Sequence, residues 1–388
     1  MTSQIQEPTD ARTRPRRRRA VSVAEIVEFL EYLAPPSLSE PDTPYGLQVG
    51  SALVTTRTVI LAPLPTYSAI SSAAAYKAGL LICAAPLLHK PLEAVRLDDP
   101  LGAKVAHLIQ RQVSFYALAN AYAAAPGGFD DSLAERLGLA GTRTLVPTQA
   151  EGQSKFVVFV PSVGVERVRN AAAEAGAGVL GAYTHCAFQT QGVGTFIPQA
   201  GSNPSVGKIG KRERVEETRL EMLVSEREMA GVIAAVLGAH PYEEVAYDIY
   251  PLRNPGVVYG RGRIGDLPLK VSLDTVLAQV NDALGLTRDD RARCLRRTEM
   301  PIGSLAAASG SSGATGESEG LLRAAQRQAA GAFVTGGVSI ADLTIADNTG
   351  TVLIDVGFAP SVAPGLQQLA AQLRETFCAT ALEVVYAP

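Results

Sequence analysis

The sequence predicts an α/β protein in which a discontinuous α/β core carries an inserted α+β module. The first observation behind this prediction is that short apolar strands alternate with amphipathic helices in both outer parts of the chain, which is typical of parallel α/β units. The second is that the middle of the chain has its own series of strands and helices, closed by loop-like junctions. At 388 residues, 47% of them apolar, the chain is long enough for two or three domains with sizeable cores.

The first half of the core is expected at residues 21–150 and begins with a helix. Apolar residues recur at helical spacing from Val21 to Leu33, and Ser22 is a suitable N-cap. The pattern then predicts, in order, a strand at 58–62, an Ala-rich helix at 67–78, a strand at 80–84, a helix at 101–111, a strand at 113–117 and a helix at 131–137.

The module is expected at residues 151–254. Its pattern predicts a strand at 155–161, a helix at 163–175, a strand at 219–224, a helix at 227–237 and a strand at 244–250. This order fits a ferredoxin-like α+β fold. The core then resumes at residues 255–388, with a helix at 273–284, a loop at 306–319, strands at 332–335 and 351–356, and a helix at 364–377.

Charge and cysteine usage argue against several classes of protein. The 35 Lys and Arg residues and 38 Asp and Glu residues give a net charge of -3, so a polyanion-binding protein is not expected. The basic run Arg12–Arg19 is expected to be a disordered, solvated arm within residues 1–20, and nucleic-acid binding is the less favoured interpretation. No secretory signal or membrane span is recognisable, so we expect a cytoplasmic protein without membrane contact. The four cysteines lack CxxC spacing and are expected to be small buried residues.

Several motifs follow one another between residues 21 and 385. They are Gly46-Leu47-Gln48-Val49-Gly50, Ala125-Pro126-Gly127-Gly128, Gly181-Ala182-Tyr183-Thr184-His185-Cys186, His240-Pro241-Tyr242-Glu243-Glu244, Gly262-Arg263-Ile264-Gly265 and Asp355-Val356-Gly357. Through them the sequence resembles the GTP cyclohydrolase 1 type 2 homologue family, also called NGG-interacting-factor-three-like. The resemblance implies an inserted domain similar to the CutA and PII folds, a homo-oligomer that is a toroidal hexamer, and two divalent metal ions in each core.

The sequence departs from this family at the positions of the metal ligands. The family's His-His-Pro is Ala84-Ala85-Pro86 here, and its His-Thr-x-x-Asp segment is residues 119–123, which ends at Ala123. Its Gly-His becomes Gly357-Phe358, with Val362 in place of the Glu four residues later. Ala, Phe and Val side chains have no donor atom for a metal ion, and without metal there is no activated water. We therefore expect no cofactor and no catalytic residue.

The favoured interpretation is a family member that has lost its dinuclear metal site, a non-catalytic pseudoenzyme or assembly scaffold that pairs with an active paralogue. The alternative is a metal-dependent hydrolase or cyclohydrolase-like enzyme whose site is rebuilt from His89 and loop carboxylates. Metal content distinguishes the two, because a rebuilt site would still hold ions.

Two further motifs have both a functional and a structural interpretation. Residues 260–265 spell GxGxxG, but the residues after them look extended, so re-entry into the core is preferred over dinucleotide binding. The second motif is a dense polar cluster. A ligand site is one interpretation of it, and acids that are solvated or lie at a subunit contact are the preferred one. The cluster consists of His240, Glu243, Glu244 and Asp248.

Overall fold

The computed structural model describes residues 19–40, 43–201, 207–310 and 317–388, so the predicted basic arm lies, apart from Arg19, outside the described residues. The chain divides into two compact units. Unit 1 consists of Met1–Val146 and Gly260–Pro388, and unit 2 is Pro147–Tyr259. Both contain sheets and helices, which confirms the mixed α/β class predicted from the sequence.

The first sheet of unit 1 combines strands from the N-terminal part of the chain with its last strand, in the order β17-β4-β5-β6-β2. Strands β17, β4, β5 and β6 pair in parallel, and β2 is antiparallel to β6. All residues of β4, β5 and β6 are buried, as expected for parallel strands covered on both faces. The bounds are β2 (Gly46–Val49), β4 (Thr58–Ala62), β5 (Leu80–Cys83), β6 (Ser114–Ala117) and β17 (Glu383–Tyr386).

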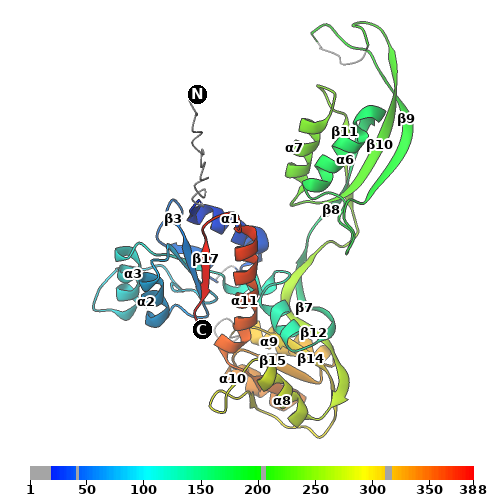
Figure 1. The fold of residues 1–388 in the computed structure, drawn as a ribbon. Coiled ribbons are helices and arrows are strands. Elements are labelled where there is room, and N and C mark those ends of the chain that lie inside the picture. The colour runs from blue at the N-terminus through cyan, green and yellow to red at the C-terminus, as the bar shows by residue number, and fades with distance from the viewer. Residues whose placement is uncertain (1–18, 41–42, 202–206, 311–316) are drawn as a thin grey trace, which may run out of the picture. The chain divides into compact units, whose positions relative to one another are not determined.

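Helices cover both faces of this sheet. Helices α2 (Tyr67–Ala75) and α3 (Pro100–Gln110) pack their apolar residues against β4, β5 and β6 (Figure 1). Helix α11 (Phe358–Thr376) lies against β4 and β17. Helix α1 (Val23–Leu33) begins with the predicted cap, a reciprocal capping box between Ser22 and Glu25. A small ribbon precedes it, formed by β1 (Val21–Ser22) and β3 (Thr55–Thr56).

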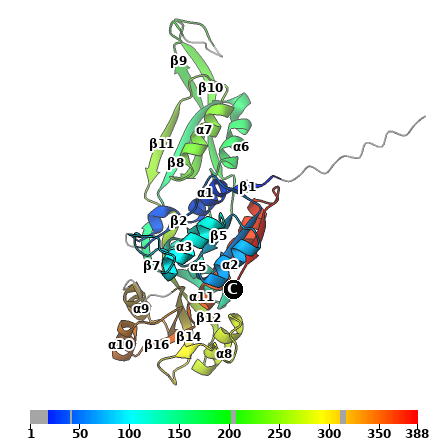
Figure 2. The ribbon, with the colours of Figure 1, turned by 90° about the vertical axis from the view of Figure 1, so that its left-hand side faces the viewer.

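The second sheet of unit 1 has the strand order β13-β16-β15-β14-β12-β7. Alternate strand residues face opposite layers of helices, with α5 and α8 on one face and α9 and α10 on the other (Figure 2). The strands are β7 (Ala140–Ala150), β12 (Val258–Val271), β13 (Arg293–Cys294), β14 (Ile302–Ala308), β15 (Ala332–Thr335) and β16 (Val352–Asp355). The helices are α5 (Phe129–Arg136), α8 (Leu273–Ala283), α9 (Glu317–Arg327) and α10 (Ile340–Thr349).

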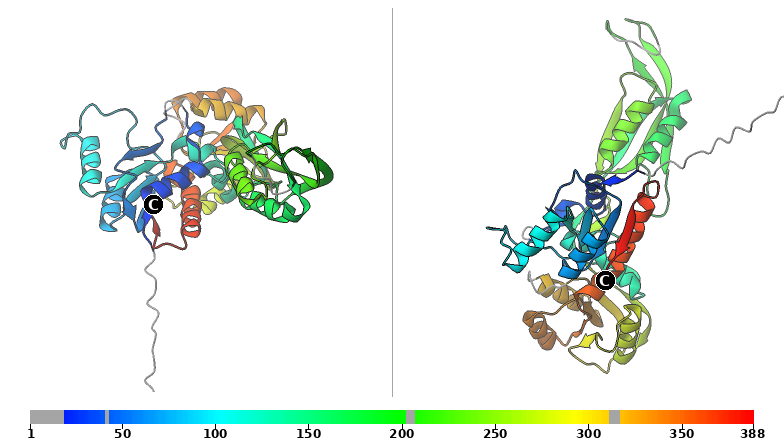
Figure 3. Two further views of the ribbon diagram at one scale, coloured as in Figure 1. Left: turned by 90° about the horizontal axis from the view of Figure 1, so that it is seen from above. Right: turned by 60° about the vertical axis from the view of Figure 1, so that its left-hand side comes forward.

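Unit 2 has the βαββαβ order of a ferredoxin-like module. Its antiparallel sheet has the order β11-β8-β10-β9, and its two helices pack together over one face (Figure 3). That face carries the alternate apolar residues of β8 and β10, which contact both helices. The elements are β8 (Gln153–Pro161), α6 (Val165–Glu174), β9 (Ala187–Phe196), β10 (Glu213–Ser225), α7 (Met229–Ala239) and β11 (Tyr247–Leu252).

Three local predictions need correction. The loop expected at 306–319 is shorter, because β14 extends to Ala308 and α9 begins at Glu317; residues 311–316 lie outside the described part. Helix α11 begins at Phe358, so Pro364 lies inside it and is not its start. Of the four cysteines only Cys83 is buried, and Cys378 is exposed.

The structure also tests the dinucleotide-binding and membrane-spanning interpretations of the sequence. The GxGxxG motif at residues 260–265 lies within β12, so no helix starts there and the extended prediction is confirmed. In the described ranges, no helix combines the length and the apolarity that crossing a bilayer requires.

Candidate functional site

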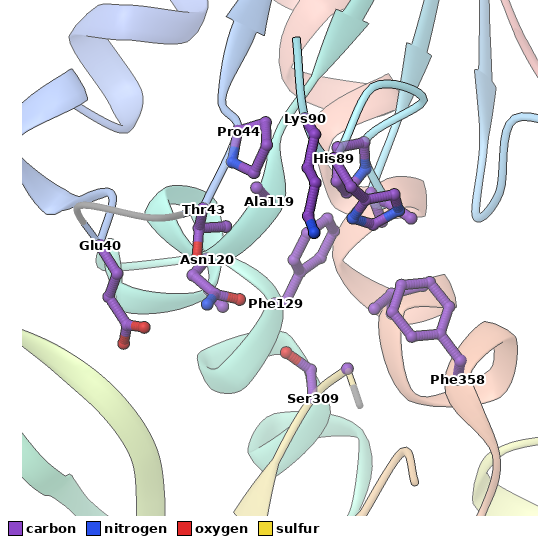
Figure 4. Close-up of a pocket in the computed structure, with 16 residues that line it drawn as sticks. Glu40, Thr43, Pro44, His89, Lys90, Ala119, Asn120, Phe129, Ser309 and Phe358 are labelled. Carbon is purple, nitrogen blue, oxygen red and sulfur yellow. The ribbon is translucent and has the colours of Figure 1, made fainter. Parts of the chain in front are cut away.

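A pocket of about 610 Å³ opens in unit 1 where several strands end (Figure 4). It contains all five positions at which metal ligands were expected through the resemblance and Ala, Phe or Val stands instead. The described lining residues are Glu40, Thr43, Pro44, Ala84, Ala85, Pro86, His89, Lys90, Ala119, Asn120, Ala123, Phe129, Ser309, Gly310, Phe358 and Val362.

The strand ends explain why residues far apart in sequence meet in this pocket. Ala84 and Ala85 follow β5, and Ala119 follows β6 by two residues. Ser309 follows β14, and Phe358 comes three residues after β16. These four strands all belong to parallel pairs, and crevices at the carboxyl ends of such strands are the usual place for ligands in open α/β sheets.

Backbone hydrogen bonds fix the wall formed by the first sheet. The amide of Ala84 donates to Ala62 O at 3.3 Å, and that of Ala119 donates to Ala84 O at 2.9 Å. Ala119 has a φ of 44°, in the left-handed region that non-glycine residues seldom adopt. It opens helix α4 (Ala119–Ala124), which carries Asn120 and Ala123 into the pocket wall.

Phe358 and Val362 come from a single helix. They are four residues apart in the first turns of α11, so their side chains lie on the same face. Gly357, with a φ of 79°, supplies the sharp change of direction between β16 and this helix. Val362 is 1% exposed and Phe358 is partly exposed, so both contribute apolar surface to the pocket.

A tight turn sets α5 beside α4. Gly127 has a φ of 68°, and its amide donates to Asp131 Oδ2 at 2.8 Å. A Cβ atom on Gly128 would lie 1.6 Å from Tyr122 O, so only glycine fits there. The turn places Phe129, the first residue of α5, in the pocket with 2% exposure.

Asp130 is a buried hub behind the pocket. Its carboxylate accepts hydrogen bonds from Arg261 Nε at 3.1 Å and from the Gly262 amide at 2.6 Å. It also accepts bonds from the amide and the hydroxyl group of Ser309, at 2.7 and 2.5 Å. A buried carboxylate is tolerated when it is paired and its oxygens are bonded, as here. Ser309 is therefore held in the pocket wall by Asp130.

A second ion pair lies beside this hub. Arg263 binds Asp131 through two parallel contacts, of which Nη2 to Oδ2 is 2.9 Å. Its Nη1 atom donates to the carbonyl groups of Gly260 and Gly262, both at 2.9 Å. The arginines of the Gly-Arg-Gly-Arg segment thus attach β12 to the start of α5, and their role is structural.

The charged and imidazole groups of the pocket lie on two loops. His89 and Lys90 are exposed and extend from the loop after β5, and Glu40 lies on the other side of the pocket (Figure 4). Burial raises the pKa of Glu40, and the charge of Arg261 partly opposes that shift.

Gln48 fixes the loop that carries His89 and Lys90. Its Oε1 atom accepts hydrogen bonds from the amides of Leu87 and Leu88, both at 2.9 Å. Its Nε2 atom donates to Leu88 O at 3.1 Å. Gln48, the central residue of the Gly46–Gly50 motif, therefore holds the backbone of the loop that carries His89 and Lys90.

The donor set of the pocket does not fit a pair of divalent metal ions. The five positions where metal ligands were expected hold Ala84, Ala85, Ala123, Phe358 and Val362, whose side chains have no nitrogen, oxygen or sulfur atom. Among the lining residues that are described, His89 and Glu40 are the only imidazole and carboxylate. Throughout the described ranges, no group of three or more His, Cys, Asp or Glu side chains is arranged to hold a metal ion.

The second predicted cluster lies in unit 2. His240 is 8% exposed; its Nδ1 atom accepts from the Tyr242 amide and its Nε2 atom donates to Phe159 O, both at 3.0 Å. Burial lowers the pKa of this imidazole, which favours the neutral tautomer that these two bonds require. Glu243, Glu244 and Asp248 are exposed, and Asp248 accepts from the Tyr250 hydroxyl at 3.1 Å. Because both ring nitrogens of His240 already bond to backbone groups, this side chain stabilises the turn in which it lies.

Sequence reasoning missed several residues of the pocket and its support. Glu40, Thr43, Phe129 and Ser309 have no recognisable motif, and the fold alone brings them together. Asp130 gave no signal of its own, because it lies in the polar stretch Asp130-Asp131-Ser132, where acids at the start of a helix are usually solvated.

The chain is thus an α/β protein with a two-sheet core, an inserted α+β module and a pocket at the strand ends of the core. A model of the Duf34/NIF3 (NGG1p interacting factor 3) family matches residues 21–388. The chain therefore belongs to this family.

Individual relatives agree with this assignment. The GTP cyclohydrolase 1 type 2 homolog of Mycobacterium leprae is 35% identical over 370 residues, which cover 93% of this chain and 92% of the relative. The homolog of Halalkalibacterium halodurans is 34% identical over 313 residues, covering 81% of this chain and 82% of the relative. The crystal structure of a Bacillus cereus protein related to NIF3 matches with a TM-score of 0.83 at 32% identity, covering 95% of this chain and 97% of that one.

Proposed function

We propose that the chain is a metal-free, non-catalytic member of the Duf34/NIF3 family that acts through binding, as a pseudoenzyme or assembly scaffold. One observation carries this proposal. All five positions expected to bear metal ligands line a single pocket, and none of their side chains offers a donor atom. A dinuclear centre needs several imidazole and carboxylate donors held together, and hydrolysis by such a centre needs the water that the ions activate.

The competing proposal is a metal-dependent hydrolase or cyclohydrolase-like enzyme with a rebuilt site. It draws on His89 and Glu40, which line the same pocket. Two such donors are fewer than even one tetrahedral ion normally takes from a protein. This count favours the metal-free proposal.

Elemental analysis of the purified protein, after incubation with zinc, manganese or iron(II) and removal of excess metal, tests the two proposals. We expect far less than one ion per chain and a melting temperature that a chelator does not change, because nothing at the pocket binds metal in the folded state. The matched control restores the ligand types of the family and should gain metal. It is the variant with Ala84→His, Ala85→His, Ala123→Asp, Phe358→His and Val362→Glu.

One or two ions per wild-type chain would overturn the metal-free proposal. If His89→Ala then released those ions, the rebuilt-site enzyme would take its place. Since the fivefold control uses the same pocket, its gain of metal would also show that the incubation could load a competent site.

We also propose an assembly role for the chain. By resemblance to its relatives, it forms a homo-oligomer, a hexamer, in the cytoplasm, with unit 2 as a CutA- or PII-like module, and it pairs with an active paralogue. The strand order of unit 2 and the exposed side chains of Phe188 and Tyr250 on its sheet support this part of the proposal.

A further inference from the structure

The pocket combines a large apolar wall with a small polar part. Side chains without polar atoms make up most of the lining and form this apolar wall, and four of them are at most 3% exposed: Ala84, Ala123, Phe129 and Val362. The volume of about 610 Å³ is within the range of pockets that hold small organic molecules, roughly 300–1,000 Å³. The wall excludes water from any ring or chain that lies against it, which favours binding of an apolar group.

Lys90 brings a positive charge to the polar part. Lys90 and His89 are adjacent on one loop and extend into the pocket (Figure 4). In the part of the chain that the structure describes, no ion pair joins Lys90 to a carboxylate. Its ammonium group is therefore available to an anion, and an ion pair beside an apolar wall is screened less than one in open solvent.

The loop that presents this charge is held by side-chain bonds. Gln48 makes three hydrogen bonds to Leu87 and Leu88, directly before His89. Because the backbone is fixed there, Lys90 loses less conformational freedom when it pairs with a ligand than it would on an open loop. Gln48 is thus a positioning residue for the cationic end of the pocket.

A third observation concerns an unsatisfied polar atom. Thr43 lines the pocket, and its Oγ1 atom is buried without a hydrogen-bond partner among the described residues. Buried hydroxyl groups in native proteins are normally bonded, so an unpaired one at a pocket wall points to a polar group supplied from outside.

We propose that this pocket binds a small organic acid that has an apolar, ring-sized body and a single carboxylate or phosphate group. The body lies against Phe129, Phe358 and Val362, and the anionic group pairs with Lys90 and His89. The inference rests on the proposed function, because a pair of bound metal ions would occupy the same space. Glu40 on the opposite side disfavours a second anionic group, so a nucleoside triphosphate is a poor ligand.

Calorimetric titration with three naphthalene compounds tests this proposal. Naphthalene-1-acetate and 1-naphthyl phosphate carry the two headgroups, and 2-(1-naphthyl)ethanol is the neutral match. We expect both anions to bind more tightly than the alcohol. Lys90→Met should weaken both anions about tenfold and the alcohol by less than about twofold, since it removes one charge and keeps the stem. The control Lys270→Met, at an exposed lysine of unit 1 outside the pocket, should change none of the three affinities.

Two further variants locate the site. Ala85→Phe adds a ring to the wall and should abolish binding of all three compounds. Gln48→Met keeps the size of the side chain but loses its three hydrogen bonds, so it should lower the ratio of anion to alcohol affinity; a loss of folding alone would not change this ratio. The anion that binds more tightly identifies the headgroup.

Three outcomes would overturn the inference: no binding by any compound, equal binding of anions and alcohol, or unchanged binding by Lys90→Met or Ala85→Phe. Titration in the presence of a chelator distinguishes a failure of the ligand inference from a failure of the metal-free proposal. Anion binding that a chelator abolishes would mean that metal is present and that the metal-free proposal fails. Absence of anion binding in a protein without metal would defeat the present inference alone.

Discussion

Single residues decide the chemistry of the pocket, and Ala123 shows this most directly. It is 3% exposed on α4, in the place of an expected metal-binding aspartate. We predict that Ala123→Asp destabilises the protein by about 1–3 kcal/mol at pH 7, because the new carboxylate is buried without metal. Chemical denaturation, followed by circular dichroism, measures this change.

The matched control is Ala123→Asn, which has nearly the same size and no charge. Burial should raise the pKa of the introduced Asp above its unfolded value of about 4. The folded state then binds more protons than the unfolded state between these two pKa values, so stability falls as the pH rises through that interval. The difference between the Asp and Asn variants should therefore shrink from pH 7 to pH 5. An Asp variant as stable as the Asn variant at pH 7 would show that a cation reaches the site.

At the scale of elements, the turn between α4 and α5 gives the next prediction. Gly128→Ala would force a Cβ atom onto Tyr122 O, 1.6 Å away, and the backbone of both helices would have to shift. We expect a loss of at least about 2 kcal/mol and weaker binding in the pocket, whose wall includes Ala123 and Phe129. Thermal melting and the naphthalene titration provide the two measurements.

Gly320→Ala is the control for this change. Gly320 lies in α9 of the same unit, and a Cβ atom there meets nothing within 4 Å. Alanine favours a helix over glycine by up to about 1 kcal/mol, so this variant should be as stable as the wild type or more so. If Gly128→Ala were equally well tolerated, the approach of Gly128 to Tyr122 O between α4 and α5 would have to be looser than 1.6 Å to an added Cβ atom.

Elements with a clear periodicity could be predicted from the sequence. The strand β4 occurs at the predicted residues, and α1 has the expected cap. The prediction missed β9, whose residues are mostly exposed and include two glycines. Its hydrogen bonds to β10 hold it in the sheet, and no buried apolar pattern marks it in the sequence. It also placed the start of α11 at Pro364, since proline favours a first turn, whereas Gly357 starts the helix two turns earlier.

The pocket itself could be predicted only in part. Ala84, Ala85, Ala123, Phe358 and Val362 were expected in one place through the resemblance, and all five line the pocket. Lys90, Gln48 and Thr43 could be recognised as pocket residues only in the folded chain. The loop that carries Lys90 is held by hydrogen bonds between Gln48 and Leu88, 40 residues apart in sequence, and Thr43 reaches the pocket through the fold alone. Such contacts leave no periodic signal in the sequence.

At the scale of the whole molecule, the cores of the two units share no residue. The apolar cluster of unit 2 lies entirely within residues 147–259, and the clusters of unit 1 lie outside them. Strands β7 and β12, which lead into and out of unit 2, are neighbours in one sheet. We predict that replacing Pro147–Tyr259 by a short Gly-Ser linker leaves unit 1 folded, because the linker joins adjacent strands.

Circular dichroism and a cooperative thermal transition of the shortened chain measure this outcome. Pro147–Tyr259 expressed alone is the companion experiment and should also fold, since its helices and sheet enclose their own core. If the shortened chain were insoluble and unit 2 failed to fold alone, the two units would depend on each other for stability.

The Asp130 hub has a consequence for the order in which the chain folds. Its partners are 132 residues away at Gly262 and 179 away at Ser309, so the hub closes two very long loops. All of unit 2 lies between Asp130 and Gly262, and during synthesis the ribosome releases the N-terminal part first. Asp130 therefore stays without these partners, its carboxylate hydrated, until the inserted module has been synthesised. The module can fold on the ribosome, and the pocket is completed last, only when β12, β14 and the start of α11 have been made.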